Sequence, residues 1–393
     1  MDIRKEALRL HRDNKGKLAV RSKVKVESKQ DLSLVYTPGV AEVCREIANN
    51  KKSIYDYTMK ANSVAVVTDG SAVLGLGNIG AEASLPVMEG KCILFKELAG
   101  IDAFPICIKS QDADEIINIV KNISPAFGGI NLEDIAAPRC FRIEEALQGT
   151  GIPIMHDDQH GTAIVVLAAL INAAKVVGKD IEEMKVVVNG VGAAGTAVSK
   201  LLMCIGIDRK LCTSVKEMVL CDSKGIIYDG RPDLNEVKRA LARYTNGQKR
   251  EGTLKDALAG ADVFVGVSKG NLLMANDLKV MNKKAIVFAM ANPTPEIMPD
   301  EAKKVAAIVG TGRSDFPNQI NNSLAFPGVF RGALDSKATK INSEMKIAAA
   351  SAIAGCVKPA IDNILPYTLD KKVVPRVAEA VAKAAKETGV CRE

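Results

Sequence analysis

Two pairs of neighbouring acids, Glu133-Asp134 and Asp157-Asp158, each follow a short apolar run that is typical of a buried strand. Ligands of open α/β sheets collect at the carboxyl ends of the strands, which is where these acids would lie. Two of the three histidines, His156 and His160, flank the second pair. Because acids between a strand and a helix are often only solvated or cap the helix, the pairs alone leave a ligand site and a surface turn both open.

Lys91 and Tyr36 have side chains suited to proton transfer. Lys91 precedes an apolar run, where a lysine usually keeps its ammonium group in water. A desolvated lysine would instead have a lowered pKa and could act as a base. Tyr36 ends a turn-rich stretch just before Pro38, at which we expect a helix to start. It could equally be a core tyrosine whose hydroxyl is hydrogen-bonded.

The most specific motif is Gly190-Val-Gly-Ala-Ala-Gly195, which follows a β-branched run and opens a predicted helix. In a dinucleotide site the first glycine makes the tight turn, Gly192 admits the pyrophosphate and Gly195 lets the helix pack on the strand. Free N–H groups at the helix N-terminus would face the phosphates. The next predicted strand ends at Asp222, the expected position of an acid for the ribose, although the spacing is longer than the usual ~20 residues. A Rossmann-like layer that binds no nucleotide is the alternative.

The elements that position these residues alternate between strands and helices. We predict strands at residues 63–69, 104–108, 130–134, 152–155, 185–189, 218–222, 261–268, 285–291 and 306–309. We predict helices at residues 3–14, 112–123, 141–147, 163–177, 193–205 and 253–258, and a helical segment over 343–386. A second glycine motif at Gly75, Gly77 and Gly80 lies five residues beyond its strand, and we expect Pro86 to interrupt the segment that follows. We interpret it as a substrate-side loop.

Composition excludes several classes of protein. Hydrophobic content of 47% and charged content of 25% describe a soluble globular chain. An aromatic content of 4%, with no Trp, argues against a base-stacking surface for nucleic acid. The net charge of +7 is scattered, which favours a small anionic substrate or simply solvated lysines. We therefore expect no nucleic-acid partner.

Cysteine usage and the N-terminus bear on location. The nine cysteines show no C-x-x-C spacing, so we expect neither a zinc site nor a disulfide framework, and a reducing cytoplasm fits best. The N-terminus has no apolar signal core. The longest apolar run, residues 163–170, is far shorter than a membrane span, so we expect no membrane partner.

From about residue 10 to its end the chain resembles a malic enzyme of the short prokaryotic type. The motifs that carry the resemblance are Tyr36-Thr-Pro-Gly-Val, Asp69-Gly-Ser-Ala-Val-Leu-Gly-Leu-Gly-Asn-Ile-Gly80, Met88-Glu-Gly-Lys91, Asn131-Leu-Glu-Asp134, His156-Asp-Asp-Gln-His-Gly-Thr162, Gly190-Val-Gly-Ala-Ala-Gly195, Ala291-Asn-Pro-Thr294 and Asn321-Asn-Ser-Leu-Ala-Phe-Pro-Gly328. The resemblance implies oxidative decarboxylation of L-malate to pyruvate and CO2, with NAD or NADP and Mg2+ or Mn2+. It also implies an assembly, a homodimer or a higher homo-oligomer.

The resemblance assigns roles residue by residue. Tyr36 would be the general acid, Lys91 the general base, and Asp157 a further catalytic residue that supports the metal ligands. The metal ligands would be Glu133, Asp134 and Asp158. The substrate would be bound by Lys91, Asn292, Asn321 and Asn322. The cofactor would be bound by Gly190, Gly192, Ala193, Ala194, Gly195, Asp222, Ser223, Lys224 and Asn292.

The predicted fold is α/β in two domains. Residues 1–158 would form an N-terminal α/β domain for substrate and metal. Residues 159–393 would form a Rossmann-type, doubly wound parallel sheet with a C-terminal helical segment. One departure from the family stands at Ala72, where longer members have an arginine that contacts substrate and cofactor. What balances the malate carboxylate here is therefore an open point.

Three questions about function stay open at this level. A malolactic-type lyase, which keeps NAD bound and releases lactate, would use the same residues. A catalytically silent nucleotide-binding protein is a third class, against which the retained Tyr36, Lys91 and acids speak. Asp222 favours NAD, whereas Ser223 and Lys224 could hold the 2′-phosphate of NADP or be a solvated turn. We predict that NADP is used at least as well as NAD.

Overall fold

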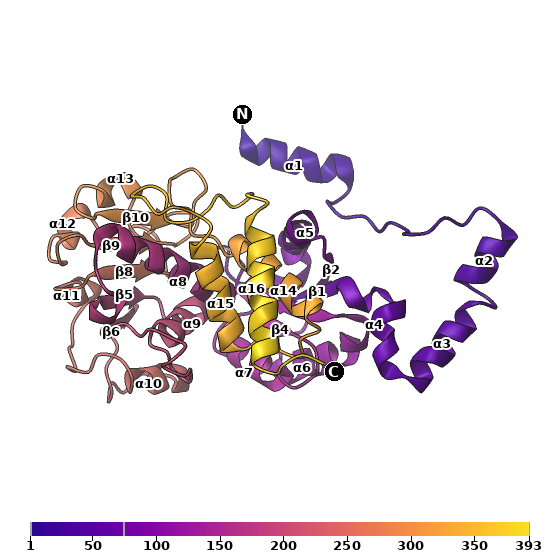
Figure 1. The fold of residues 1–393 in the computed structure, drawn as a ribbon. Coiled ribbons are helices and arrows are strands. Elements are labelled where there is room, and N and C mark those ends of the chain that lie inside the picture. The colour runs from indigo at the N-terminus through magenta and orange to yellow at the C-terminus, as the bar shows by residue number, and fades with distance from the viewer. Residues whose placement is uncertain (1, 74, 393) are drawn as a thin grey trace.

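The computed structural model describes residues 2–73 and 75–392; Met1, Leu74 and Glu393 lie outside the described part. It consists of two α/β lobes and an N-terminal arm (Figure 1). The arm comprises α1 (Ile3–Asn14), α2 (Lys29–Val35) and α3 (Val40–Asn49), and none of the residues of these three helices is buried. Figure 1 shows α2 and α3 standing away from both lobes. The arm is thus held to the rest of the chain by few contacts of its own.

The first lobe is a four-stranded parallel sheet in the order β2-β1-β3-β4. Its strands are β1 (Ser63–Thr68), β2 (Asp102–Cys107), β3 (Gly129–Leu132) and β4 (Ile154–His156), and its helices include α5 (Gly80–Ala99), α6 (Ala113–Ile123) and α7 (Arg139–Leu147). All of β1, β3 and β4 is buried, as expected of a parallel sheet with both faces covered. The predicted strands and helices of this lobe are confirmed to within a few residues.

The second lobe is a six-stranded sheet in the order β10-β9-β8-β5-β6-β7. Its strands are β5 (Lys185–Asn189), β6 (Glu217–Asp222), β7 (Gly225–Ile226), β8 (Val263–Gly266), β9 (Ile286–Ala289) and β10 (Ile308–Thr311). The five predicted parallel strands are present. The antiparallel β7 was not predicted, because a two-residue strand has no periodicity to detect. This is the doubly wound arrangement expected of a Rossmann-type domain.

Shorter helices connect these elements. They are α4 (Ile54–Tyr57), α10 (Glu236–Ala242), α11 (Leu254–Ala257), α12 (Ala275–Leu278) and α13 (Pro299–Ala302), with 3-10 turns η1 (Lys51–Ser53), η2 (Met59–Asn62), η3 (Ser124–Ala126), η4 (Ile181–Glu183) and η5 (Asn322–Leu324). The fingerprint helix α9 (Ala193–Leu202) ends earlier than the predicted residue 205. Its end coincides with Cys204, which adopts a left-handed φ of 52° and cannot continue the helix.

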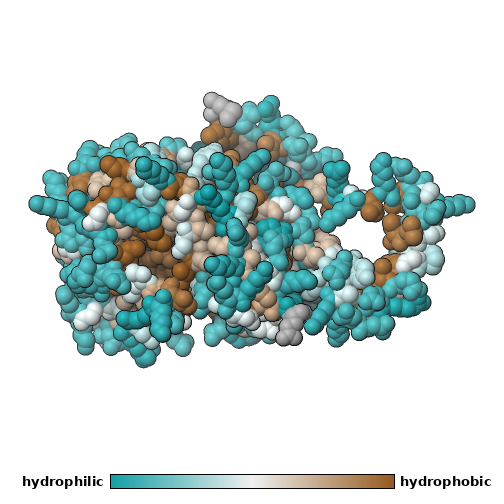
Figure 2. All heavy atoms as spheres, in the orientation of Figure 1, coloured by the Kyte–Doolittle hydropathy of each residue, from teal (hydrophilic) through white to brown (hydrophobic). Residues whose placement is uncertain are grey.

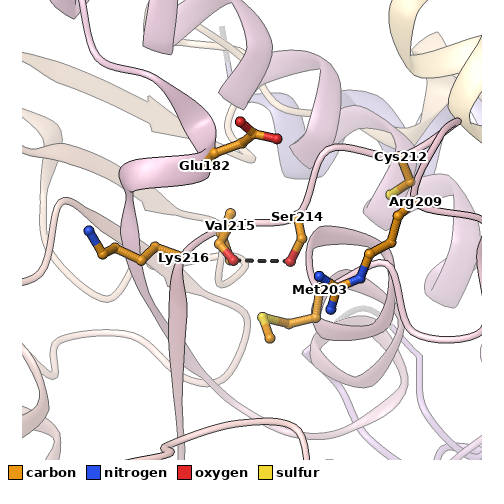
Figure 3. Close-up of a pocket in the computed structure, with 7 residues that line it drawn as sticks. All are labelled: Glu182, Met203, Arg209, Cys212, Ser214, Val215 and Lys216. Atoms are coloured by element: carbon orange, nitrogen blue, oxygen red, sulfur yellow. Dashed lines mark hydrogen bonds between the residues drawn. The ribbon is translucent and has the colours of Figure 1, made fainter.

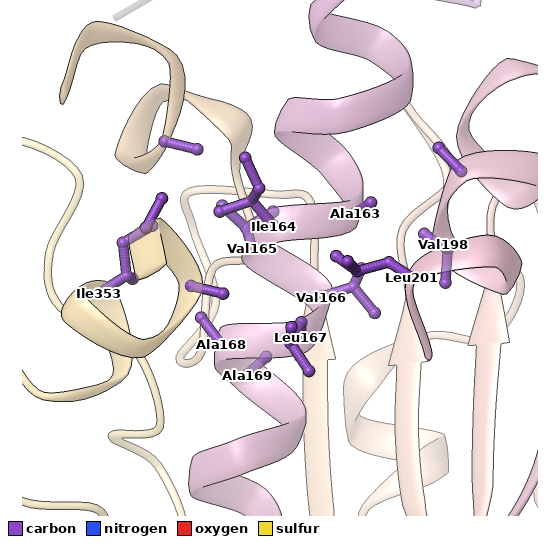
Figure 4. Close-up of a cluster of buried hydrophobic side chains, with 14 of the residues drawn as sticks. Ala163, Ile164, Val165, Val166, Leu167, Ala168, Ala169, Val198, Leu201 and Ile353 are labelled. Atoms are coloured by element: carbon purple, nitrogen blue, oxygen red, sulfur yellow. The ribbon is translucent and has the colours of Figure 1, made fainter. Parts of the chain in front are cut away.

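Helix α8 (Asp157–Val177) joins the two lobes and is largely buried. Residues Ala163 to Ala169 pack between Val198 and Leu201 of α9 on one side and Ile353 on the other (Figure 4). The helix begins at Asp157 rather than near Gly161, where we predicted its start. By length and composition alone α8 could cross a membrane, but 72% of the apolar window is buried inside the protein, as in a core helix.

The C-terminal helices α14 (Phe326–Asp335), α15 (Ser343–Ala354) and α16 (Val373–Glu387) return to the first lobe. Phe326 and Phe330 of α14 pack edge-on against Phe95 of α5, with ring centroids 4.7 and 5.4 Å apart. Residues 355–372 form no helix, which corrects the expectation of one nearly continuous helical segment. Phe326 therefore brings the end of the chain to α5, the helix that also carries Lys91.

Two local expectations were wrong. Cys204 and Cys212 form a disulfide with a Cα–Cα distance of 5.8 Å, although no cysteine pattern had indicated one. The chain folds back after α9, and this return is a matter of tertiary structure rather than spacing. Helix α5 runs through Pro86, at which we had expected an interruption. Pro86 is the seventh residue of the helix, so α5 forgoes the hydrogen bond that an N–H at this position would donate to the carbonyl of Glu82.

Candidate active site

Three carboxylates from two strand ends converge at one edge of the first sheet. Glu133 and Asp134 follow β3, Asp158 follows β4, and one oxygen of each lies within 4.8 Å of the other two. The convergence follows from the parallel register, which pairs Leu132 with His156 and so ends both strands at one level. Asp134, at a left-handed φ of 53°, donates its backbone N–H to Asp158 Oδ2 at 2.7 Å. The bend after β3 lets two consecutive acids reach one point.

These acids fit the divalent ion that the family resemblance implies. Burial raises the pKa of Glu133 to about 7 and that of Asp158 to about 6; repulsion by Asp158 adds to the shift of Glu133, and repulsion by Asp157 adds to that of Asp158. A cation between them would relieve that repulsion. A site built only of oxygen atoms suits a hard ion such as Mg2+ or Mn2+.

Lys91 lies against this cluster, on α5. Its ammonium is 2.9 Å from Glu133 Oε1 and 2.8 Å from Asp157 Oδ2, and it lies 4.3 Å from the centroid of the Phe326 ring. Burial lowers the pKa of Lys91, but the carboxylates of Asp157 and Glu133 raise it by more, so it stands above its ordinary value. The alternative of a lysine with its head in water is wrong. The lowered pKa that a desolvated lysine would have is not found either, because the pKa of Lys91 is raised.

Asp157 is the point at which three distant segments meet. Its Oδ2 accepts from Lys91 and, at 2.6 Å, from Asn322 Nδ2 of η5. Asp157 is fully buried, and burial raises its pKa to about 7. Its other oxygen lies so near Gly161 that a Cβ at that position would come within 1.8 Å of Oδ1. The glycine of the His156–Thr162 motif therefore makes room for this carboxylate.

The other two predicted asparagines lie elsewhere. Asn321 accepts from the backbone N–H of Ser323 at 2.9 Å and so caps η5, which is turn chemistry. Asn292 follows β9, and its carbonyl oxygen would lie 2.5 Å from a Cβ added at Gly75. The glycine-rich stretch of the first lobe therefore contacts the strand exit of the second. Of the three asparagines, Asn322 is the one that donates a hydrogen bond to Asp157, the neighbour of Asp158 in the acidic cluster.

A buried glutamate that the sequence gave no reason to select lies beneath the cluster. Glu144 of α7 accepts from the backbone N–H of His156 at 3.1 Å, from Gln159 Nε2 at 3.1 Å and from His160 Nε2 at 2.9 Å. Although burial raises the pKa of Glu144, His160 and its other neighbours lower it by more, to about 2. Glu144 is thus a buried, charged and hydrogen-bonded group.

The glycine fingerprint has the geometry of a phosphate-binding turn. Gly190 has φ 105°, and a Cβ at Gly195 would lie 1.7 Å from the Gly190 carbonyl oxygen. A Cβ at Gly192 would meet nothing within 4 Å, so this face of the loop is open. Ala193 and Ala194 begin α9, whose first N–H groups point from the helix N-terminus. The loop fits a dinucleotide pyrophosphate.

At the end of β6 the predicted ribose acid is already paired. Asp222 accepts from Arg231 Nη2 at 2.9 and 2.7 Å and from Lys238 Nζ at 2.6 Å. Lys224, mostly exposed, has its ammonium 2.9 Å from Asp233. Three cations thus surround two carboxylates, leaving one positive charge in surplus. Arg231 and Lys238 were missed because they come after a chain reversal, and nothing in their spacing points to Asp222.

Tyr36 is not brought to Lys91 within the chain. It ends α2 in the arm and is 67% exposed. Apolar side chains beside it are exposed too, including Leu34 at 68% and Leu32 at 52%. Figure 2 shows brown apolar atoms on this outlying part of the molecule. The predicted general acid and general base are therefore separated in a single copy of the chain.

A cavity of about 340 Å³ lies at the opposite end of α9 from the glycine fingerprint (Figure 3). It is lined by Glu182, Met203, Arg209, Cys212, Ser214, Val215 and Lys216. None of the predicted site residues lines it. We therefore place the candidate active site at the acidic cluster and not in this cavity.

Known proteins similar to this chain share both of its lobes. Residues 14–148 match the family model "malic enzyme, N-terminal domain", and residues 159–386 match "malic enzyme, NAD binding domain". The chain is 58% identical to the "bifunctional malic/malolactic enzyme" of Bacillus subtilis, across all of this chain and 95% of that one. It is 53% identical to the "NAD-dependent malic enzyme" of Geobacillus stearothermophilus, across 96% of this chain and 78% of that one. A crystal structure of the NAD-dependent malic enzyme from Thermotoga maritima, 50% identical, has a TM-score of 0.92 over 96% of this chain and 98% of that one.

Proposed function

Because the chain belongs to the malic enzyme family, we propose that it converts L-malate to pyruvate and CO2 with reduction of NAD or NADP. The observation that carries the proposal is the acidic cluster of Glu133, Asp134 and Asp158 beside Lys91. A 2-hydroxy acid needs a base for its hydroxyl proton and a nicotinamide for its hydride. Lys91, beside the cluster in the first lobe, is the base. The glycine fingerprint of the second lobe binds the nicotinamide cofactor.

The residues divide the work as follows. Mg2+ or Mn2+, held by Glu133, Asp134 and Asp158, would polarise the substrate carbonyl when bound. Lys91 would take the hydroxyl proton as the neutral amine, after passing a proton to the Asp157 carboxylate that lies 2.8 Å from its Nζ. Asn322 donates to the same carboxylate and so holds it in position. Tyr36 returns a proton to carbon after CO2 leaves. Asn292 and Asn322 bind the substrate, while Asn321 supports that loop through its cap.

We further propose that the protein is a homodimer in which the arm of one copy completes the site of the other. Tyr36 lies on an arm without buried residues, and its apolar neighbours Leu32 and Leu34 need a surface to cover them. A second copy of the same chain would provide that surface and receive the tyrosine near its Lys91. A two-fold dimer gives two identical shared sites.

The proposal extends to the choice of cofactor, to a second candidate function and to location. The surplus positive charge around Asp222 favours acceptance of a 2′-phosphate, so NADP is used at least as well as NAD. The relative named as a bifunctional malic/malolactic enzyme raises a second candidate function, release of lactate with NAD retained. We place the protein in the cytoplasm, which agrees with its seven free cysteines, although the Cys204–Cys212 disulfide is unusual for that compartment.

A spectrophotometric assay with L-malate and Mn2+ tests the proposal. Equal amounts of NAD(P)H and pyruvate, dependent on added metal, are the expected result. Lactate without net NAD(P)H would instead identify malolactic chemistry. No turnover of malate with either cofactor would refute the proposed function.

A further inference from the structure

One carboxylate fastens the turn that carries the acids of the site. The three groups that donate to Glu144 are His156 N–H, Gln159 Nε2 and His160 Nε2, at 2.9 to 3.1 Å. All three belong to the five residues from β4 into the first turn of α8. Asp157 and Asp158 lie inside that segment. The position of both acids therefore depends on a residue of a different helix, α7.

The turn must have a defined position because the side chains of the two acids contact different partners. Asp157 Oδ2 meets Lys91 and Asn322, whereas Asp158 Oδ2 meets the N–H of Asp134. A shift of the turn would misplace both contacts at once. The backbone of a first helical turn has unpaired N–H groups and no intrahelical restraint on them, so its position is set by such outside contacts.

Glu144 itself is removed from the site. Only 9% of the residue is exposed, and its contacts run to the histidines and Gln159 rather than to Glu133, Asp134 or Asp158. It cannot take part in the chemistry directly. Its three charge-assisted hydrogen bonds are stronger than bonds between neutral groups, which suits it to hold a turn.

Resting on the proposed function, we propose that Glu144 is a positioning residue: it fixes the turn 156–160 so that Asp158 joins the metal-binding cluster and Asp157 meets Lys91. Supporting contacts of this kind orient the ligands of a metal. Their loss typically reduces metal affinity about 10- to 100-fold. A merely structural role would instead loosen the whole protein and affect both lobes.

The nucleotide-binding lobe offers a matched control. Glu296 is fully buried and accepts from the backbone N–H groups of Ser268 at 2.9 Å and Ala291 at 3.1 Å. It joins the exits of β8 and β9 in the same manner as Glu144 joins the exit of β4 to α7. Glu144→Gln and Glu296→Gln are therefore the same substitution at two buried glutamates, one in each lobe.

The test measures Mn2+ binding by the paramagnetic resonance signal of the free ion and NADH binding by fluorescence, on the full chain. We expect Glu144→Gln to weaken Mn2+ binding about 10- to 100-fold and to change NADH binding less than about twofold. Glu296→Gln should do the reverse. Gln159→Ala, which removes one donor and leaves the carboxylate with two, should weaken Mn2+ binding less than Glu144→Gln does.

Several results would overturn the assignment. Unchanged Mn2+ binding in Glu144→Gln would do so, as would equal losses of Mn2+ and NADH. If Glu144→Gln does not fold, Gln159→Ala decides, and unchanged Mn2+ binding in that variant refutes the role. A parent protein that binds Mn2+ and NADH yet turns over no malate would sink the proposed function and leave the positioning role standing.

Discussion

The Nζ atom of Lys91 lies 2.8 Å from Oδ2 of Asp157, inside the protein. The two residues are 66 positions apart in the chain and come from α5 and α8. The same oxygen accepts from Asn322, which belongs to the second half of the chain. The candidate site is therefore assembled from both lobes, and substitutions in either should disturb it.

Asp158→Asn should abolish metal-dependent turnover and leave the fold and dinucleotide binding intact. The change removes one of three clustered charges but keeps an oxygen to accept from the N–H of Asp134. Mn2+ affinity should fall by more than the roughly 10- to 100-fold seen on losing an outer contact. Asp114→Asn, an exposed acid paired with Arg142, serves as the control and should behave as the parent. Near-normal activity of Asp158→Asn at modest Mg2+ would contradict the metal assignment.

Much of this site was accessible from the sequence because it depends on local rules. Strand ends, the acids that follow them and the glycine fingerprint all show in periodicity and spacing. Parallel pairing of β3 with β4 then forces Glu133 and Asp158 to one edge. Asn322 also followed from its motif, although its bond to Asp157 did not.

Other features depend on tertiary structure and could not be foreseen. Glu144 and Arg231 look like ordinary helix and loop charges until packing places them under the site and beside Asp222. The disulfide of Cys204 with Cys212 depends on a chain reversal rather than on a cysteine pattern. Tyr36 lies on an exposed arm away from Lys91, and nothing in the spacing of the two residues shows that they do not meet in one copy of the chain.

Mixing two inactive variants tests the shared site. Tyr36→Phe and Lys91→Ala should each be nearly inactive as pure proteins. If each site takes Tyr36 from one copy and Lys91 from the other, a random mixture regains activity because a mixed dimer has one intact site. For equal amounts the recovery should approach about a quarter of parent activity. Activity that stays at the level of the separate variants would place both residues in a single copy.

Gly161→Ala should reduce turnover far more than stability. A Cβ at this position would come within 1.8 Å of Asp157 Oδ1, so the carboxylate must move away from Lys91. A displacement of about 1 Å at a reacting group costs on the order of 100-fold in kcat. Gly355→Ala is the control, since its Cβ would meet its nearest atom at an ordinary 3.4 Å. Parent-like kcat in Gly161→Ala would show that Asp157 needs no fixed position.

Acid stability should depend on Glu144. Its pKa in the folded protein is about 2, below the ordinary value of 4.5, so the folded state releases the proton more readily than the unfolded chain. The stabilisation is complete above pH 4.5 and is lost as the pH falls towards 2. It amounts to on the order of 3 kcal/mol. The difference in unfolding free energy between the parent and Glu144→Gln should therefore shrink across this range, which denaturant titrations at several pH values would measure. A difference that does not vary with pH would contradict the depressed pKa.

Cofactor choice should depend on Lys224. Asp222, which would otherwise repel a 2′-phosphate, is neutralised by Arg231 and Lys238. The ammonium of Lys224 is paired with Asp233 and mostly exposed, so it is free to turn towards a phosphate at little cost. Removing it in Lys224→Ala takes away one charged hydrogen bond, worth roughly 1.5–3 kcal/mol or about 10- to 150-fold in affinity. We expect the KM for NADP to rise by that order and the KM for NAD to stay within about twofold.

The matched control for Lys224→Ala is Lys255→Ala, because Lys255 forms a similar exposed pair with Asp277 in the same lobe. It should leave both KM values unchanged, which separates a contact with the 2′-phosphate from a general loss of positive charge. An equal rise of both KM values in Lys224→Ala would mean that Lys224 supports the loop rather than the phosphate. Strict use of NAD by the parent enzyme would show that Asp222 still governs the pocket, despite its pairing with Arg231 and Lys238.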